Sequence, residues 1–290
     1  MWQWFCIHDE SYALFFHVVP QKFYPGDLIF PVFLFASGAS LWLYIFKLKR
    51  KRQSLVEAER KYLSLLLLGF FFSGLKFFSI FPDEVMIIAL LGILSLNLFW
   101  AFGRTGVYLA AVALSLFFLW LWVWSPGIIF QYYFKMLGGE LGFAYFAIIY
   151  LVGFAVSSYA FPSAVPNSAS LKKLSLLLLH IAFLAFFFSL LWPIERLSLS
   201  PSFLALSLSV SLLILTILVL LCDLWGFKSD FFVLLGQNSI WGWGLLSISL
   251  PISFVFNLKV AMPVWLYLLC CIALIFLLYA ALAKFVKKKS

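Results

Sequence analysis

Nine long apolar segments run through this chain, and they leave it few ways to fold. A helix that crosses a lipid bilayer needs about 20 mostly apolar residues. Segments of this kind lie at 27–46, 63–81, 85–102, 106–124, 142–161, 174–192, 202–222, 231–250 and 264–283. The sequence therefore predicts an all-α fold, a polytopic transmembrane helix bundle of about nine spans.

The composition excludes a soluble domain. Hydrophobic residues make up 65% of the 290 residues, against roughly 45–50% in soluble domains. Charged residues make up 11%, where about 25% is usual. The four cysteines form no Cys-x-x-Cys pair and lie near no histidine at metal-ligand spacing; they are Cys6, Cys222, Cys270 and Cys271. We therefore expect neither a disulfide framework nor a metal site.

The basic residues identify one face of the predicted bundle. The run from Lys47 to Arg52, continued to Lys61, is typical of a cytoplasmic loop. When the side alternates with each span, 15 of the 20 Lys and Arg residues fall on that face, four fall on the opposite face and Lys76 falls within a span. This distribution explains the net charge of +9 without nucleic acid, which we do not expect as a partner.

The same alternation gives a domain plan. We expect an outer-face segment at 1–26, a transmembrane helix bundle at 27–283 and a basic cytoplasmic tail at 284–290. The predicted location is a membrane crossed many times, which would be the plasma membrane, or the inner membrane in a bacterium.

Ionisable groups at membrane depth are costly, which makes them candidates for function. Asp27 opens the first span, and it shares a helix face with Pro31, Leu34 and Gly38. His17 stands ten residues earlier, and a histidine can accept a proton near neutral pH. One interpretation is a catalytic pair. The other is that Asp27 caps its helix and His17 is a solvated loop residue.

A second candidate site opens the eighth span. Asn238, Trp241 and Gly242 share a helix face at spacings i, i+3 and i+4. A buried amide beside an aromatic platform can hold a ligand, but asparagine and glycine also serve helix packing. In the sixth span, His180 is expected to be a hydrogen-bonded packing residue. Among soluble motifs, no Walker A, GxGxxG or HExxH pattern occurs.

Several sequence blocks, in the right order over 17–244, resemble the heparan-α-glucosaminide N-acetyltransferase-like membrane family. The string Asp27–Ser40 resembles the family's "D-L-[IV]-F-P-x-F-L-F-x-x-G-x-S" signature, and His17 stands at the spacing of the family's catalytic histidine. Trp192–Phe203 resembles "P-I-N-K-x-L-W-T-x-S-F/Y", and Leu235–Ser239 resembles "G-x-N-A/S-L". The family's opening "R-x-x-S-L-D-x-x-R-G" helix has no counterpart, which indicates a divergent or N-terminally shortened member.

The resemblance implies a membrane-embedded acyltransferase. It would move an acetyl or acyl group from cytoplasmic acetyl-CoA, as co-substrate, to an amino-sugar or other glycan acceptor on the opposite face. In this reading His17 is the general base, Asp27 orients it, and Asn238 and Trp241 hold the donor. The alternative is a non-enzymatic membrane transporter, or a degenerate scaffold member with the same fold. Membrane lipids are expected partners in either case, and association into a homo-oligomer stays open.

Overall fold

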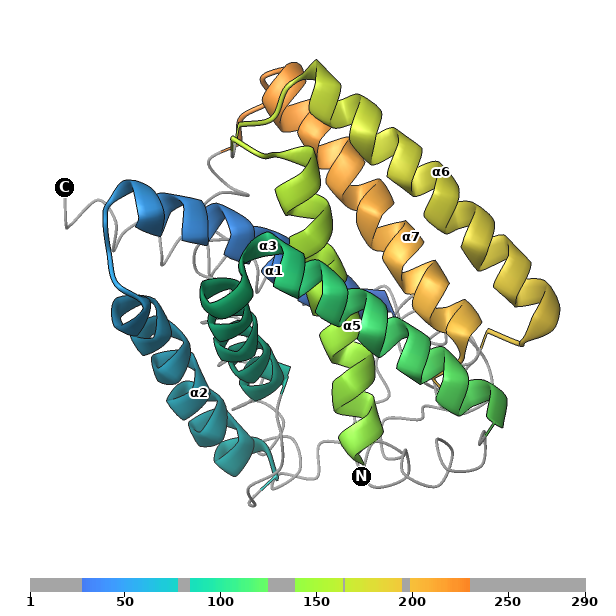
Figure 1. Ribbon diagram of the computed structural model, residues 1–290, viewed down its shortest axis with the longest axis horizontal. Coiled ribbons are helices and arrows are strands. Elements are labelled where there is room, and N and C mark those ends of the chain that lie inside the picture. The colour runs from blue at the N-terminus through green and yellow to red at the C-terminus, as the bar shows by residue number, and fades with distance from the viewer. Residues whose placement is uncertain (1–27, 78–83, 125–138, 164, 195–198, 230–290) are drawn as a thin grey trace, which may run out of the picture.

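The computed structural model describes residues 28–77, 84–124, 139–163, 165–194 and 199–229 (Figure 1). All the regular structure within these ranges is helical. It comprises α1 (Ile29–Arg50), α2 (Leu55–Phe77), α3 (Glu84–Trp124), α5 (Gly139–Ala160), α6 (Ser168–Leu191), α7 (Pro201–Leu218) and the π-helix η4 (Val219–Leu224). The predicted all-α class is thus confirmed for this part of the chain.

The described helices correspond to the first seven predicted spans. The spans predicted at 231–250 and 264–283 lie outside the described residues, as do the segments at 1–26 and 284–290. The count of nine therefore stays a prediction, and so does the domain plan.

Polar residues start two of the helices before their apolar stretches begin. The side chain of Asn167 accepts a hydrogen bond from the Ser170 backbone N–H at 2.9 Å. In return, the Ser170 hydroxyl oxygen accepts one from the Asn167 backbone N–H at 3.3 Å. This capping box begins α6 at Ser168, ahead of the predicted start at 174. At α7 the Ser200 hydroxyl accepts a single capping hydrogen bond from the Phe203 backbone N–H at 3.2 Å, with Pro201 in the first helical position.

The helix α3 is broken near its middle. Gly103 has φ 67° and ψ −159°, a backbone conformation essentially open to glycine alone. Figure 1 shows that α3 changes direction there, so its halves are two separate helical rods. This break agrees with the two spans predicted at 85–102 and 106–124.

Two helices cross at the centre of the described bundle. Gly38 of α1 lies directly on the backbone of Tyr150, and Gly153 of α5 lies directly on the backbone of Phe35. A side chain at either glycine would collide with backbone atoms that no rotamer change can move. These two glycines therefore allow α1 and α5 to approach closely. Pro31, Leu34 and Gly38, three members of the predicted shared face, are all buried.

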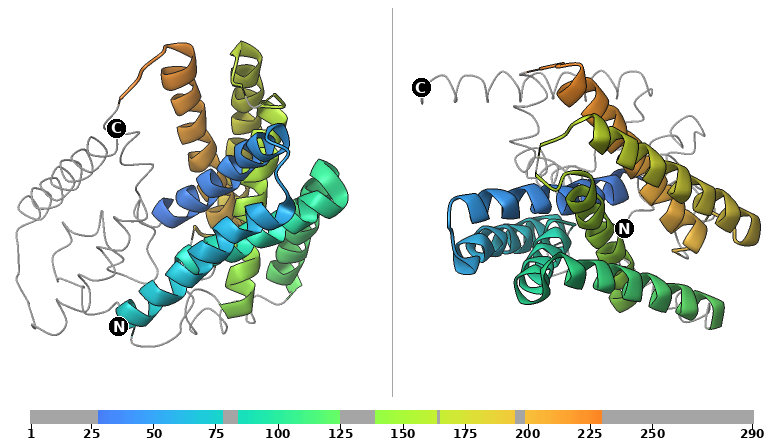
Figure 2. Two further views of the ribbon diagram at one scale, coloured as in Figure 1. Left: turned by 90° about the vertical axis from the view of Figure 1, so that its left-hand side faces the viewer. Right: turned by 45° about the horizontal axis from the view of Figure 1, so that its top comes forward.

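The remaining helices surround this crossing (Figures 1 and 2). The helix α3 packs on α5 and on α2, while α6 and α7 form an antiparallel pair and α7 also contacts α1. Aromatic rings fill much of the interior; Trp42, for example, meets Phe99 and Phe154 edge to face.

The outer surface matches a lipid environment. Among the described residues, five helices are long and apolar enough to cross a membrane. On α6, large apolar side chains are widely exposed, among them Leu179, Phe183 and Leu190 at 66–68%. Soluble monomers rarely expose so much contiguous apolar surface. These helices support the prediction of a multi-helix membrane protein.

Candidate functional site

The four residues predicted to carry function lie outside the described part of the chain. These are His17, Asp27, Asn238 and Trp241. Their geometry is therefore untested, and the functional roles predicted for them stay predictions. The basic segment 47–61, which we expected to be a cytoplasmic loop, is described, and it forms the end of α1, the turn after it and the start of α2.

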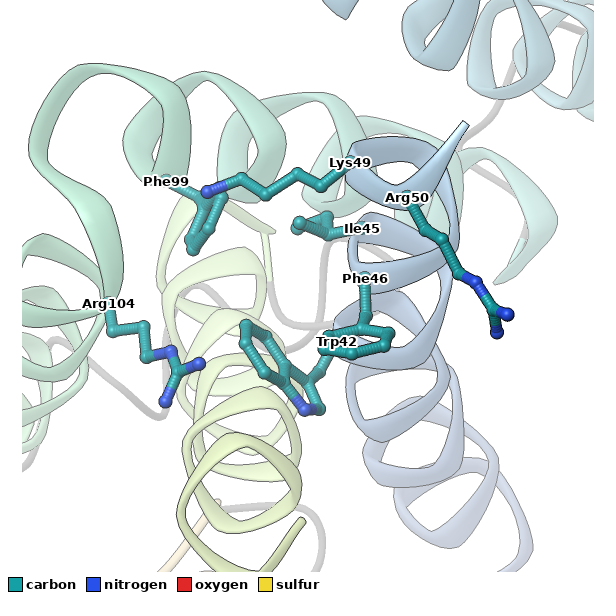
Figure 3. A pocket seen from close by; sticks show the side chains of 7 residues that line it. All are labelled: Trp42, Ile45, Phe46, Lys49, Arg50, Phe99 and Arg104. Carbon is teal, nitrogen blue, oxygen red and sulfur yellow. The ribbon is translucent and has the colours of Figure 1, made fainter. Parts of the chain in front are cut away.

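A pocket of about 270 Å³ opens between the last turns of α1 and the break in α3 (Figure 3). Its lining residues come from α1 (Trp42, Ile45, Phe46, Lys49 and Arg50) and from α3 (Phe99 and Arg104). The lining is thus aromatic at the base and cationic at the mouth.

The indole of Trp42 forms the fixed wall of the pocket. Trp42 is only 3% exposed, and its Nε1–H donates a hydrogen bond to the Phe161 carbonyl at 2.8 Å. That carbonyl follows the end of α5, where helix carbonyls lack intrahelical donors. The bond therefore holds the ring of α1 against the end of α5. A buried ring with its polar atom satisfied is a rigid surface for a ligand.

Two cations lie on the aromatic faces of the pocket. The Arg104 guanidinium carbon lies 4.1 Å from the centroid of the Trp42 ring. The Lys49 Nζ lies 4.5 Å from the centroid of the Phe99 ring. Both distances are within the range of cation–π attraction. Arg50 also lines the pocket, but its side chain points away from the other labelled groups (Figure 3).

Local structure explains why both cations line this pocket. Lys49 lies in the last turn of α1, where a positive charge is favoured by the helix dipole. Arg104 follows the Gly103 break and thus extends from the turn between the two halves of α3. Residues far apart in the sequence are brought together because the end of α1 packs beside this turn (Figure 3).

Similar cation–aromatic pairs occur at neighbouring helix ends. Lys61 Nζ lies 4.4 Å from the centre of the Tyr44 ring, and Lys173 Nζ lies 4.9 Å from that of Tyr159. Removal from water, together with the nearby charge of Lys47, holds the pKa of Lys61 below its usual value. The cationic surface therefore extends beyond the pocket.

The lining suits binding rather than bond-making. Among the residues described, the pocket wall contains no histidine, cysteine, serine or carboxylate, so the amine of Lys49 is its one described group that could serve as a base or nucleophile. Within the same ranges, no group of three or more His, Cys, Asp or Glu could hold a metal ion. What the pocket offers is positive charge beside flat aromatic surface, which fits an anionic group attached to an apolar or ring-bearing body.

His180 was expected to be a hydrogen-bonded packing residue. It is hydrogen-bonded, since its Nδ1 lies 2.7 Å from the Leu176 carbonyl oxygen. Its side chain is exposed rather than packed inside the described bundle.

The pocket itself was not predictable from the sequence. The positions of Lys49 and Arg104 on one face were predicted from charge alternation. Trp42 and Phe99 gave no signal, because aromatic residues make up 21% of the chain and these two stand in ordinary apolar stretches. The one usable clue was the Gly103–Arg104 dipeptide between two spans.

Comparison with known proteins adds no assignment. No protein-family model matches the sequence, and a search of curated proteins finds no match. The resemblance of the sequence blocks is therefore a basis for hypotheses about function and not for membership of a family.

Proposed function

We propose that this chain is a membrane-embedded acyltransferase that takes its acyl group from acyl-CoA at the basic end of the bundle. The proposal rests on one observation, a pocket in which Lys49 lies over the Phe99 ring and Arg104 lies over the Trp42 ring. Coenzyme A carries phosphate groups and a flat adenine ring, and these two features match the cations and the aromatic faces.

The size of the pocket limits what it holds. Ligand-binding pockets usually occupy about 300–1,000 Å³, whereas this one is about 270 Å³. The pocket therefore fits one portion of the head group, and the thioester arm would extend from it along the bundle. The acceptor and the proposed base His17 belong at the opposite face.

The proposed reaction is an acyl transfer to an amino-sugar or glycan acceptor. The acceptor amine or hydroxyl attacks the thioester carbonyl carbon, the carbon–sulfur bond breaks, and CoA leaves as the thiol. His17 would take the proton from the attacking group, with Asp27 favouring the charged imidazole. These two roles rest on the sequence resemblance alone.

A transfer assay tests the proposal. The full-length protein in lipid nanodiscs is given radiolabelled acetyl-CoA and glucosamine, and labelled product is measured. His17→Ala should abolish transfer, because general-base catalysis typically contributes about 10²–10⁴ in rate. His8→Ala, in the same N-terminal segment, is the matched control and should retain activity.

The non-enzymatic alternative is favoured by one observation. Apart from the amine of Lys49, which lies on the Phe99 ring, no described residue of the pocket wall can act as a base or nucleophile. Such a wall fits a site that binds its ligand without transferring a group. Acetyl-CoA that binds but is never turned over, with any amino-sugar acceptor tried, would favour a transporter or scaffold. A failure of acetyl-CoA to bind at all would overturn the acyltransferase proposal.

A further inference from the structure

We propose that Arg104 and Lys49 form a two-pronged site for a single phosphate group, seated between the rings of Trp42 and Phe99. The phosphate would belong to the head group of an anionic membrane phospholipid or to a soluble phosphate ester such as coenzyme A. This inference concerns the ligand chemistry of the pocket, and it holds whether or not the chain transfers an acyl group.

Arg104 and Lys49 form no ion pair with a carboxylate among the described residues, and no acidic residue stands in the described pocket wall. Each cation rests instead on a ring face, at 4.1 Å for Arg104 and 4.5 Å for Lys49. Exposed cation–π contacts are weak compared with charge-assisted hydrogen bonds. An incoming anion would therefore gain two strong partners at little cost.

The two cations match a tetrahedral anion. A guanidinium presents a rigid fork of donors that fits two phosphate oxygens, while an ammonium binds a further oxygen as a point charge. Arg104 and Lys49 come from different helices and approach the opening from two sides (Figure 3). A phosphate has more acceptor oxygens than a carboxylate, so it can offer a separate oxygen to the ammonium while its others engage the guanidinium.

The pocket lies between helices that are long and apolar enough to cross a membrane, at the ends where the described basic residues gather. Basic pockets of this kind, between spans, bind phospholipid head groups. Trp42 and Phe99 are only 3% and 5% exposed, so the half-buried ring of Phe46 in the pocket lining is left to supply apolar surface for the glycerol of a lipid or the adenine of a nucleotide.

The experiment compares three variants that each remove one positive charge from the basic end of the bundle. Arg104→Gln and Lys49→Gln remove the proposed ligands. Lys51→Gln is the matched control, because Lys51 is exposed after the end of α1 and is not among the residues that line the pocket. All three side chains are exposed, and the thermal unfolding of each purified variant is compared with that of the unaltered protein.

Two arms separate the sources of the phosphate. In the first, native mass spectrometry counts phosphatidylglycerol retained by protein released from mixed phosphatidylglycerol–phosphatidylcholine nanodiscs. In the second, protein in phosphatidylcholine nanodiscs is titrated with coenzyme A and with pantetheine, which lacks the phosphates. Loss of one charge-assisted contact should weaken binding about tenfold or more in Arg104→Gln and Lys49→Gln. The change in Lys51→Gln should stay below about twofold.

Selective weakening in the first arm supports the proposal with a lipid as the source, and selective weakening in the second supports it with a soluble ester. Equal weakening by all three variants would mean general electrostatic attraction and would overturn it. Binding of neither probe would also overturn it. Transfer activity is assayed on the same preparations, so that phosphate binding without transfer removes the acyltransferase proposal and leaves this one standing.

Discussion

Trp42 shows how one side chain can serve fold and site together. Its ring packs edge to face on Phe99 and Phe154 at 6.3 Å and 5.9 Å between centroids. Its N–H holds the end of α5, and its free face receives Arg104. The residue is therefore fixed by packing before any ligand arrives, which is what a preorganised binding surface requires.

Lys61 provides a test of the electrostatics at this end of the bundle. Its pKa is lowered by burial and by Lys47, so the unfolded chain keeps the proton to a higher pH than the folded chain does. Folding stability should therefore rise with pH between the lowered pKa and about 10.5, where the group also deprotonates in the unfolded chain. Below that window the protonated lysine opposes folding.

We predict that Lys61→Met raises the unfolding temperature at neutral pH. Methionine removes the unfavourable charge and keeps a contact with the Tyr44 ring. The gain should shrink as the pH is raised toward 10.5, because the unaltered lysine then loses its own penalty. Thermal unfolding measured between pH 7 and pH 10.5 checks this, with Lys51→Met in the exposed turn after α1 as control. A gain that is the same at every pH would contradict the pKa assignment.

At the scale of elements, the break in α3 determines where Arg104 lies. An added Cβ at Gly103 would meet nothing within 4 Å, so space does not limit substitution there. The limit is the backbone, since φ 67° with ψ −159° is strained for any residue with a side chain. Gly38 is the opposite case, because there the backbone of α5 occupies the space.

We predict that Gly103→Ala destabilises the protein by about 1–3 kcal/mol, the usual cost of such strain. It should also weaken phosphate-ligand binding, because the turn would relax and carry Arg104 away from Trp42. Thermal unfolding and a coenzyme A titration measure the two effects. Thr105→Ala, at the exposed position after Arg104, should change neither the unfolding temperature nor the affinity for coenzyme A by much. A Gly103→Ala protein with unaltered stability would show that the turn is not held in this conformation.

The sequence predicted these elements better than it predicted their contacts. Apolar length located α1, α5, α6 and α7 because lipid exposure demands unbroken hydrophobic runs. It missed the polar first turns of α2 and α6, since the Asn167 capping box and the charges of α2 begin helices outside the apolar stretch. It also missed the pairing of Trp42 with Arg104, because that contact depends on how α1 packs beside the turn of α3. No local pattern encodes such a tertiary contact.

On the scale of the whole molecule, tertiary contacts connect the basic helix ends. The end of α1 meets the turn of α3 through Lys49 and Arg104. The start of α2 is joined to α3 by the hydrogen bond from Asn97 to Glu59 at 2.6 Å. The start of α6 is joined to the end of α5 because Lys173 donates to the Tyr159 carbonyl at 3.2 Å. Every Lys and Arg whose side chain is described belongs to a segment predicted for the cytoplasmic face.

The last prediction concerns the side of the membrane that this end faces. Positive charge is retained on the cytoplasmic side during insertion, so the basic end should be cytoplasmic. With the four native cysteines replaced by alanine, single cysteines are placed at Ser54, at Ser163 and at Pro193. The first two stand at the basic helix ends, whereas Pro193 follows α6 at its other end. An impermeant maleimide added to intact cells should label position 193 alone, and permeabilised cells should show labelling at all three. Labelling of position 54 or 163 from outside would show that the basic end faces away from the cytoplasm. Cytoplasmic acyl-CoA could then not reach the pocket from that end.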